Sequence, residues 1–211
     1  SCVSPFSIEA AEMCIDIGFD YIKIASGEVS NMPMIDYLSK NKDLKIIMSS
    51  GMSSFDEILR SVKKLKNRKE FYLLQCTSIY PCPPEKSGLN FIEVFKKKYK
   101  VNVGLSDHTT TDATAIAAAA LGACVIEKHF TLSKDLYGPD ASFSLDANEF
   151  SKLCASLDYV WAAINSKNTI IEVFKKQNVR TLGVDPASNI CKLANRRGIK
   201  TIDSFFDKNI S

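Results

Sequence analysis

The sequence has few histidines, little net charge and no long apolar run. Its 211 residues include two histidines and carry a formal net charge of +3. With so small a charge, and no stripe of lysine and arginine among aromatic residues, a nucleic-acid-binding surface is not expected. The longest apolar stretch, around residues 113–126, is too short to cross a bilayer and contains Gly122. We therefore expect neither a nucleic acid nor a membrane as a partner.

Paired cysteine motifs are also absent. Seven cysteines are present, an odd number, and none forms a C-x-x-C pair. This pattern favours reduced thiols and a cytoplasmic location, and it argues against a structural zinc site. Cys14, Cys124 and Cys154 fall in apolar patterns, which predicts small core residues. No secretory signal is visible, and because the chain begins at Ser1 rather than methionine, an upstream part is expected to be missing.

A repeated strand-then-helix pattern is present instead. Apolar stretches typical of strands begin near residues 20, 44, 71, 101 and 123, each followed by a helical pattern, and residues 1–4 look like the end of an earlier strand. Such a pattern indicates an α/β fold with a parallel sheet covered by helices. An open doubly wound sheet and a (β/α)8 TIM barrel both fit. Polar residues follow every strand rather than one switch point, which favours the barrel.

The stretch from residue 103 to 131 is predicted to be a strand, a helix and a second strand at 123–126. Each of the two histidines follows one of these strands. Because parallel strands end at the same edge of a sheet, their polar residues should share one rim. Two imidazoles with flanking carboxylates could hold one divalent metal, with water or substrate completing the shell. The alternative is two unrelated surface histidines. The residues expected on this rim are Ser106, Asp107, His108, Glu127 and His129.

Lys23 interrupts an apolar strand at a position where a charge would face the barrel interior. A buried lysine needs a partner, and a bound phosphate or carboxylate would provide one. Other polar residues follow the remaining strands, although for any single serine or threonine a turn or a helix cap is the simpler interpretation. These residues are Ser4, Ser26, Glu28, Ser49, Ser50, Thr77, Ser78 and Tyr80.

The pattern changes after about Asn165. Strands at 179–184 and 199–202 flank a helix at 188–197, as in part of a Rossmann-like αβα segment. Asp185 follows its strand where a nucleotide-binding fold places the acid that holds a ribose. The glycine-rich turn that should precede it is absent, because residues 165–168 read NSKN. We therefore divide the chain into residues 1–165, a partial barrel, and residues 166–211, a segment not expected to bind a cofactor.

Six short motifs occur in one order: KIASGE (23–28), SSGM (49–52), QCTSIYPCPP (75–84), GLSDHT (104–109), IEKHFT (126–131) and GPDASFSL (138–145). Together they resemble the sialic acid synthase family, which includes the legionaminate and pseudaminate synthases, over about residues 1–164. The resemblance implies a TIM-barrel enzyme. Such enzymes join phosphoenolpyruvate to an N-acetylated amino sugar aldehyde, producing a nine-carbon 2-keto acid and phosphate.

The resemblance also implies roles for individual residues. Glu28 and Glu127 would be the catalytic carboxylates, which handle protons or orient water and the metal shell. His108 and His129 would hold Mn²⁺ or Mg²⁺, a Lewis acid for the aldehyde. Full-length members would be homodimers. The remaining assignments are phosphoenolpyruvate binding by Ser4, Lys23, Ser26, Ser78 and Ser106, and contact with the acceptor sugar by Tyr80 and Asp140.

The chain also departs from the family pattern. The family's first two strands, with a glutamate and a phosphate-binding lysine, and its C-terminal antifreeze-like domain have no counterpart here, so strands three to eight are expected. Residues 169–209 instead resemble a fragment of a sugar C-methyltransferase. We expect the isolated chain to be inactive in the condensation. The alternatives are a truncated, non-catalytic module that binds phosphate and metal, and an adenosylmethionine-dependent sugar methyltransferase, against which the missing glycine turn argues.

Overall fold

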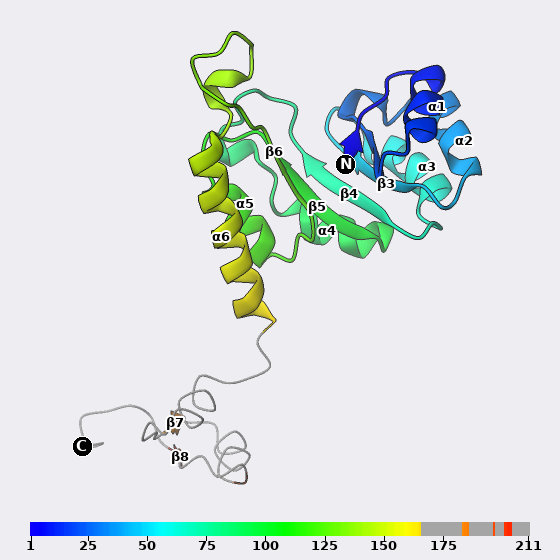
Figure 1. Cartoon of the computed structure of the whole chain (residues 1–211). Coiled ribbons are helices and arrows are strands. Elements are labelled where there is room, and N and C mark those ends of the chain that lie inside the picture. The colour runs from blue at the N-terminus through cyan, green and yellow to red at the C-terminus, as the bar shows by residue number, and fades with distance from the viewer. Residues whose placement is uncertain (166–182, 186–195, 197–200, 204–211) are drawn as a thin grey trace. The chain divides into compact units, whose positions relative to one another are not determined.

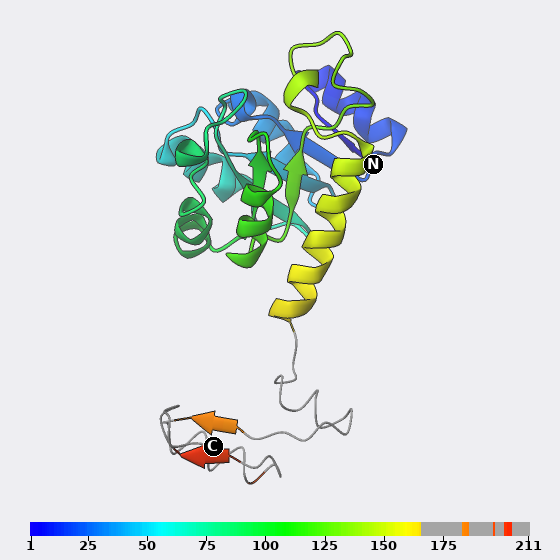
Figure 2. The same cartoon turned by 90° about the vertical axis from the view of Figure 1, so that its left-hand side faces the viewer.

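The structure, a computed structural model, describes residues 1–165, 183–185, 196 and 201–203. The chain divides into two compact units, Ser1–Trp161 and Ala162–Ser211. The first unit contains a parallel sheet of six strands, which lie side by side in chain order and curl into an open half-barrel (Figures 1 and 2). The strands are β1 (Cys2–Val3), β2 (Tyr21–Ile24), β3 (Lys45–Ser49), β4 (Phe71–Cys76), β5 (Asn102–Asp107) and β6 (Ile126–Lys128).

Helices connect successive strands, as the sequence predicted. Their ends follow from local chemistry: Ser7 caps α1 by accepting from the Ala10 amide, and Gly18 ends it with φ 88°. Ser54 and Glu57 form the predicted capping box of α3. The helices are α1 (Ile8–Ile17), α2 (Met32–Lys40), α3 (Phe55–Leu65), α4 (Phe91–Tyr99), α5 (Ala113–Ala120) and α6 (Ala147–Ile164), with short 3-10 turns at Ser26–Glu28, Pro84–Lys86 and Ala141–Phe143.

Alternate strand residues point to opposite faces of the sheet. Ile22 and Ile24 of β2 and Ile46 and Met48 of β3 are buried in the main core. Lys23 lies between the two β2 isoleucines, so it faces the concave side of the half-barrel, as predicted. The period-2 pattern thus separates a packed outer face from an inner face that carries polar residues.

The position of β6 differs from the prediction. A strand was expected at residues 123–126, but β6 begins at Ile126. The amide of Ala123 still donates to the Ala118 carbonyl and completes the end of α5, so the apolar stretch starts before the strand does. As a result Glu127 and Lys128 belong to the strand, where they pair in register with Ser106 and Asp107 of β5.

Two cysteine predictions are wrong. Cys124 and Cys154 are exposed, and Cys14 is only partly buried. An apolar sequence neighbourhood does not bury a residue whose side chain lies on the outer side of a helix or turn. All six cysteines that the structure describes carry free thiols.

In the second unit two short parallel strands are described, β7 (Gly183–Asp185) and β8 (Thr201–Asp203). They overlap the strands expected at 179–184 and 199–202. The rest of the proposed αβα segment, including the helix at 188–197 apart from Arg196, lies outside the described residues. The division at residue 165 and the methyltransferase-like character of 166–211 therefore stay predictions. None of the helices described is both long and apolar enough to cross a membrane.

Candidate functional site

A cavity of about 650 Å³ opens at the carboxyl ends of the strands, on the concave side of the half-barrel. Its walls come from strand ends or following loops of β1, β2, β3, β4, β5 and β6. Of the predicted site residues, the structure brings into its lining Ser4, Lys23, Ser26, Ser78, Tyr80, Ser106, His108, Glu127 and His129.

Lys23 contacts Glu127 across the cavity. The Lys23 side chain is only 12% exposed, and its Nζ lies 3.1 Å from Glu127 Oε2. The hydroxyl of Ser106 donates to Glu127 Oε1 at 2.9 Å. The sequence predicted a bound anion as the partner of this lysine, whereas the structure supplies a protein carboxylate 104 residues away. Glu127 therefore satisfies the buried ammonium while remaining 40% exposed towards the cavity.

The two histidine rings lie face to edge, with their centroids 5.1 Å apart. His108 Nδ1 is 2.9 Å from the carbonyl oxygen of Thr77. A carbonyl only accepts hydrogen bonds, so Nδ1 carries the proton and the lone pair is on Nε2. His129 Nδ1 is 3.5 Å from Asp140 Oδ2. The ring of Tyr80 stacks 4.2 Å from His108. The pair is thus close enough to share one ligand.

The two histidines have opposite pKa shifts. For His108 burial alone would lower the pKa, but contacts with the Cys76 thiol and the Thr77 carbonyl outweigh it and raise the pKa. Burial lowers the pKa of His129, and the neighbouring His108 lowers it further. Burial likewise raises the pKa of Cys76, but hydrogen bonds with His108 and Ser26 outweigh it, so the net pKa is lowered. A positive charge at this site is therefore carried by His108 before His129.

Two buried serine hydroxyls in the cavity wall, Ser49 Oγ and Ser78 Oγ, have no hydrogen-bond partner within the described part of the chain. An unsatisfied buried hydroxyl costs about 1–3 kcal/mol, so such groups are typical of ligand sites. Gly51 keeps this space open, because a Cβ there would lie 2.6 Å from Ser78 Oγ and 2.9 Å from Ser26 Oγ. Sequence reasoning noted Ser49 as a strand-end residue but did not select it, since a turn or cap explained it equally well.

Glu28 and Asp140 lie outside the residues that line the cavity. Glu28 is in the turn after β2 and accepts a hydrogen bond from Asn31 Nδ2 at 2.7 Å. Asp140 is 48% exposed at its side chain and reaches only the His129 edge of the site. The predicted catalytic role of Glu28 and sugar contact of Asp140 stay predictions.

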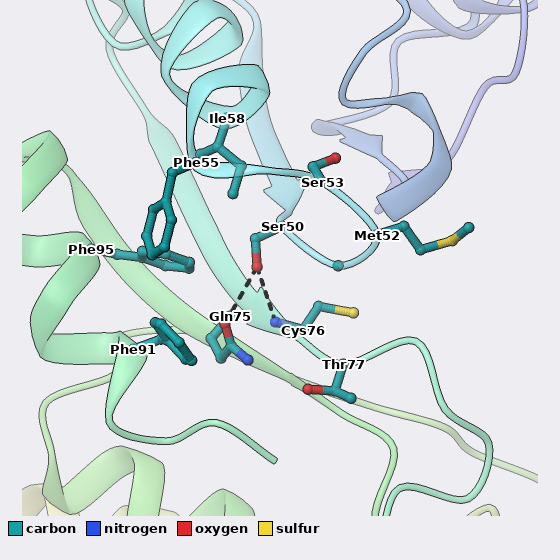
Figure 3. Close-up of a pocket in the computed structure, with 11 residues that line it drawn as sticks. Ser50, Met52, Ser53, Phe55, Ile58, Gln75, Cys76, Thr77, Phe91 and Phe95 are labelled. Carbon is teal, nitrogen blue, oxygen red and sulfur yellow. Dashed lines mark hydrogen bonds between the residues drawn. The ribbon is translucent and has the colours of Figure 1, made fainter. Parts of the chain in front are cut away.

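A smaller cavity of about 240 Å³ lies next to the first, between the residues that follow β3 and helices α3 and α4 (Figure 3). Phe55, Phe91 and Phe95 form its apolar wall. Its buried polar side chains are already bonded: the Ser50 hydroxyl bridges the Gln75 side chain and the Cys76 amide, as the dashed lines in Figure 3 show. The larger cavity is the candidate site because its wall carries Ser49 Oγ and Ser78 Oγ, the buried hydroxyls that lack a partner within the described part of the chain, and neither residue lines the smaller cavity.

The histidine pair can be tested as a metal site by its donor set. Among the described residues, no group of three His, Cys, Asp or Glu side chains is arranged to hold a metal ion. Two imidazoles, one with its proton fixed on Nδ1 by Thr77, fit a weak site in which water or ligand oxygens supply the other positions. The residues therefore fit a divalent metal whose binding depends on a second ligand.

Comparison with known proteins finds a matching family and several relatives. The model of the NeuB family matches residues 1–169. N,N'-diacetyllegionaminic acid synthase of Campylobacter jejuni is 36% identical over 213 residues, covering 99% of this chain and 61% of that protein. Pseudaminic acid synthase of Helicobacter pylori is 35% identical over 156 residues, covering 73% of this chain and 46% of that protein.

A solved structure is similar in fold. The N-acetylneuraminic acid synthetase of Leptospira borgpetersenii, crystallised with citrate, superposes with a TM-score of 0.74 at 30% identity. That match covers 83% of this chain and 61% of the other. The chain thus spans about three fifths, or less, of the length of these similar proteins.

Proposed function

Because the chain belongs to the NeuB family, we propose that it is part of a nonulosonic acid synthase, which condenses phosphoenolpyruvate with an N-acetylated amino sugar aldehyde. The product is a nine-carbon 2-keto acid, and phosphate is released. One observation carries the proposal: a buried lysine, two unsatisfied serine hydroxyls and a histidine pair face the same cavity.

The serine and lysine side of the cavity suits the anionic substrate. Phosphoenolpyruvate carries a phosphate and a carboxylate, so it needs cationic and hydroxyl donors. Lys23 provides the cation, and the hydroxyls of Ser26, Ser49, Ser78 and Ser106 surround it at the strand ends. Ser4 completes this side, with its hydroxyl bonded to the Lys23 carbonyl at 3.1 Å. Binding of the anion would satisfy the two hydroxyls that have no partner in the protein.

The histidine side suits the acceptor. His108 and His129 would hold Mn²⁺ or Mg²⁺, which when bound supplies Lewis-acid polarisation of the aldehyde carbonyl. Tyr80 covers both rings, with centroids 4.2 Å and 5.7 Å away, and Asp140 lies at the edge by His129. In this proposal these two residues contact hydroxyls of the sugar.

The reaction forms one carbon–carbon bond. Carbon 3 of phosphoenolpyruvate attacks the aldehyde carbon, the aldehyde oxygen gains a proton, water adds at carbon 2, and the tetrahedral intermediate loses phosphate. Glu127 is held between Lys23 and Ser106, within the cavity, so its carboxylate can orient that water and accept its proton. Glu28, in the turn after β2, is the second candidate carboxylate.

The closure of the barrel, the oligomeric state and the location of the full protein belong to the same proposal. The six parallel strands would be part of a closed (β/α)8 barrel, the full protein would be a homodimer, and the reduced thiols are consistent with a cytoplasmic location. The relatives are named for two different products, legionaminic acid and pseudaminic acid. The proposal therefore does not assign one particular acceptor sugar to this chain.

The test separates binding from turnover. Calorimetry would measure phosphoenolpyruvate binding to the chain, and a phosphate-release assay with Mn²⁺ would use N-acetylmannosamine and its diacetamido 6-deoxy analogues. Phosphate release that needs an amino sugar supports the synthase. Binding without release supports the second candidate, a non-catalytic phosphate- and metal-binding module, which the unsatisfied hydroxyls would also serve. Absence of phosphoenolpyruvate binding would contradict both.

A further inference from the structure

Lys128 is a buried cation that the proposed chemistry does not use. It lies in β6 between Glu127 and His129, and its side chain is 2% exposed. Its Nζ donates to Asp107 Oδ2 at 2.8 Å and to the backbone carbonyls of Thr109 at 2.6 Å and Thr111 at 2.8 Å. An ammonium has three protons, so these bonds use its full donor capacity.

The Lys128–Asp107 ion pair is expected to contribute little net stability to the fold. Taking two charges out of water costs free energy that their attraction barely recovers. Apolar residues of similar size in their place often stabilise a protein equally well. What the pair does provide is a defined geometry, because Lys128 reaches Asp107 at the end of β5 and the Thr109 and Thr111 carbonyls on one short loop. That loop follows β5 and contains His108.

The ion pair joins the two strand ends that carry the histidines. Asp107 and Lys128 are register partners on β5 and β6, and His108 and His129 each follow one of them directly. Asp107 Oδ1 also accepts from the Thr109 amide at 2.9 Å, which closes the turn around His108. Loss of this connection would let the loop after β5 move relative to β6.

Two other contacts fix His108 within that loop. Its Nδ1 bonds to the Thr77 carbonyl, and its own carbonyl accepts from the Cys82 amide at 2.8 Å. Both partners belong to the segment after β4. Lys128 therefore adds a side-chain connection between the loop of His108 and β6, beyond the backbone pairing of β5 with β6, while Thr77 and Cys82 connect His108 to the segment after β4.

We propose that Lys128 is a positioning residue, which acts through Asp107 and the loop to hold the His108 and His129 rings at their 5.1 Å separation. The importance of that separation rests on the proposed function, in which the two rings share one metal. The positioning itself is a property of the protein that can be measured without metal.

The test compares three variants with the wild type. Lys128→Met removes the charge and keeps the length, and Lys128→Met with Asp107→Asn also removes the unpaired buried carboxylate while keeping an acceptor for the Thr109 amide. Lys45→Met is the matched control, since Lys45 pairs with Glu70 at 3.2 Å at the amino ends of the strands. Circular dichroism and thermal unfolding would establish that each variant folds.

Two readouts are expected to change. The chain has only two histidines, so nuclear Overhauser contacts between their ring protons can be assigned without ambiguity. We expect these contacts in the wild type and in Lys45→Met, and their loss in the folded double variant. Mn²⁺ affinity, measured by electron paramagnetic resonance, should fall by about 10–100-fold in the double variant, as for other residues that orient metal ligands.

The outcomes separate the two proposals. Ring contacts that persist in the folded double variant overturn the positioning role, whatever happens to metal binding. Ring contacts that are lost, in a chain whose wild type binds no Mn²⁺, support the positioning role and contradict the metal site. A fourth variant, Lys128→Arg, keeps the charge, and retention of the ring contacts in it would further support positioning by the cation.

Discussion

Polar residues lie at both ends of the strands, but the two ends differ in whether these residues have hydrogen-bond partners within the protein. At the amino ends, Tyr21 Oη donates to Glu70 Oε2 at 2.5 Å, and Lys45 Nζ lies 3.2 Å from Glu70 Oε1. Tyr72 Oη reaches the same carboxylate at 3.4 Å. Each polar group of this cluster has a partner, and the Lys45 ammonium also lies 5.2 Å from the centre of the Tyr21 ring.

At the carboxyl ends the polar groups outnumber their partners. Lys23 and Glu127 pair, but the hydroxyls of Ser49 and Ser78 are buried without a partner in the described structure, and a cavity adjoins them. A complete set of partners indicates a cluster that stabilises the fold, whereas an incomplete set beside a cavity indicates a ligand site. Residue type alone does not distinguish the two ends.

The largest expected effect concerns metal binding at the carboxyl end. Either His108→Ala or His129→Ala should lower Mn²⁺ affinity by at least about 100-fold, because each removes one of two protein ligands and loss of a supporting residue alone costs up to that much. Electron paramagnetic resonance titration would measure it. Equal affinity in the wild type and both variants would show that the histidines share no metal.

The second effect compares two lysines. Lys23→Met should weaken phosphoenolpyruvate binding by about 10–100-fold, because a hydrogen bond to a charged group contributes about 1.5–3 kcal/mol. Lys45→Met at the amino end should leave the affinity within about threefold, since Lys45 bonds only to the structural cluster. Calorimetry would measure both. A similar loss in both variants would remove the distinction between the two ends.

The third effect compares buried serines with and without a partner. Ser61, in α3, donates to the Val29 carbonyl at 2.6 Å, so Ser61→Ala should lower the free energy of unfolding by about 1 kcal/mol. Ser49→Ala should leave it unchanged or raise it, and should weaken phosphoenolpyruvate binding about 2–10-fold. Urea unfolding and calorimetry would measure these changes. A clear loss of stability in Ser49→Ala would mean that its hydroxyl has a structural partner.

The smallest effect is a pH dependence at the amino end. The hydrogen bond to Glu70 raises the pKa of Tyr21 from 10.0 to about 12, so the folded state holds this proton more tightly than the unfolded state. The stability from this contact is fully present below pH 10 and is lost as the pH rises towards 12. Tyr21→Phe should therefore reduce the decline in unfolding free energy across this range. An unchanged decline would place its cause elsewhere.

Much of the fold followed from the sequence by itself. Strand and helix positions depend on local periodicity and caps, and Ser7, Gly18 and the Ser54–Glu57 box are where the sequence placed them. The parallel order follows because each helix returns the chain to the same end of the sheet. The same rule brought residues after different strands, including His108 and His129, to one rim.

Only the tertiary structure decided which of these residues contact one another. Alternation along β2 predicts the face on which Lys23 lies, but the curl of the sheet decides that Glu127, 104 residues away, becomes its partner. The end of α5 decides where β6 begins, and hence that Lys128 pairs with Asp107. Ser49 and Ser50 are adjacent strand-end serines in the sequence, yet one is unsatisfied and the other bonded, because that depends on neighbours from other strands. Local pattern determines a residue's face, and long-range packing determines its partners.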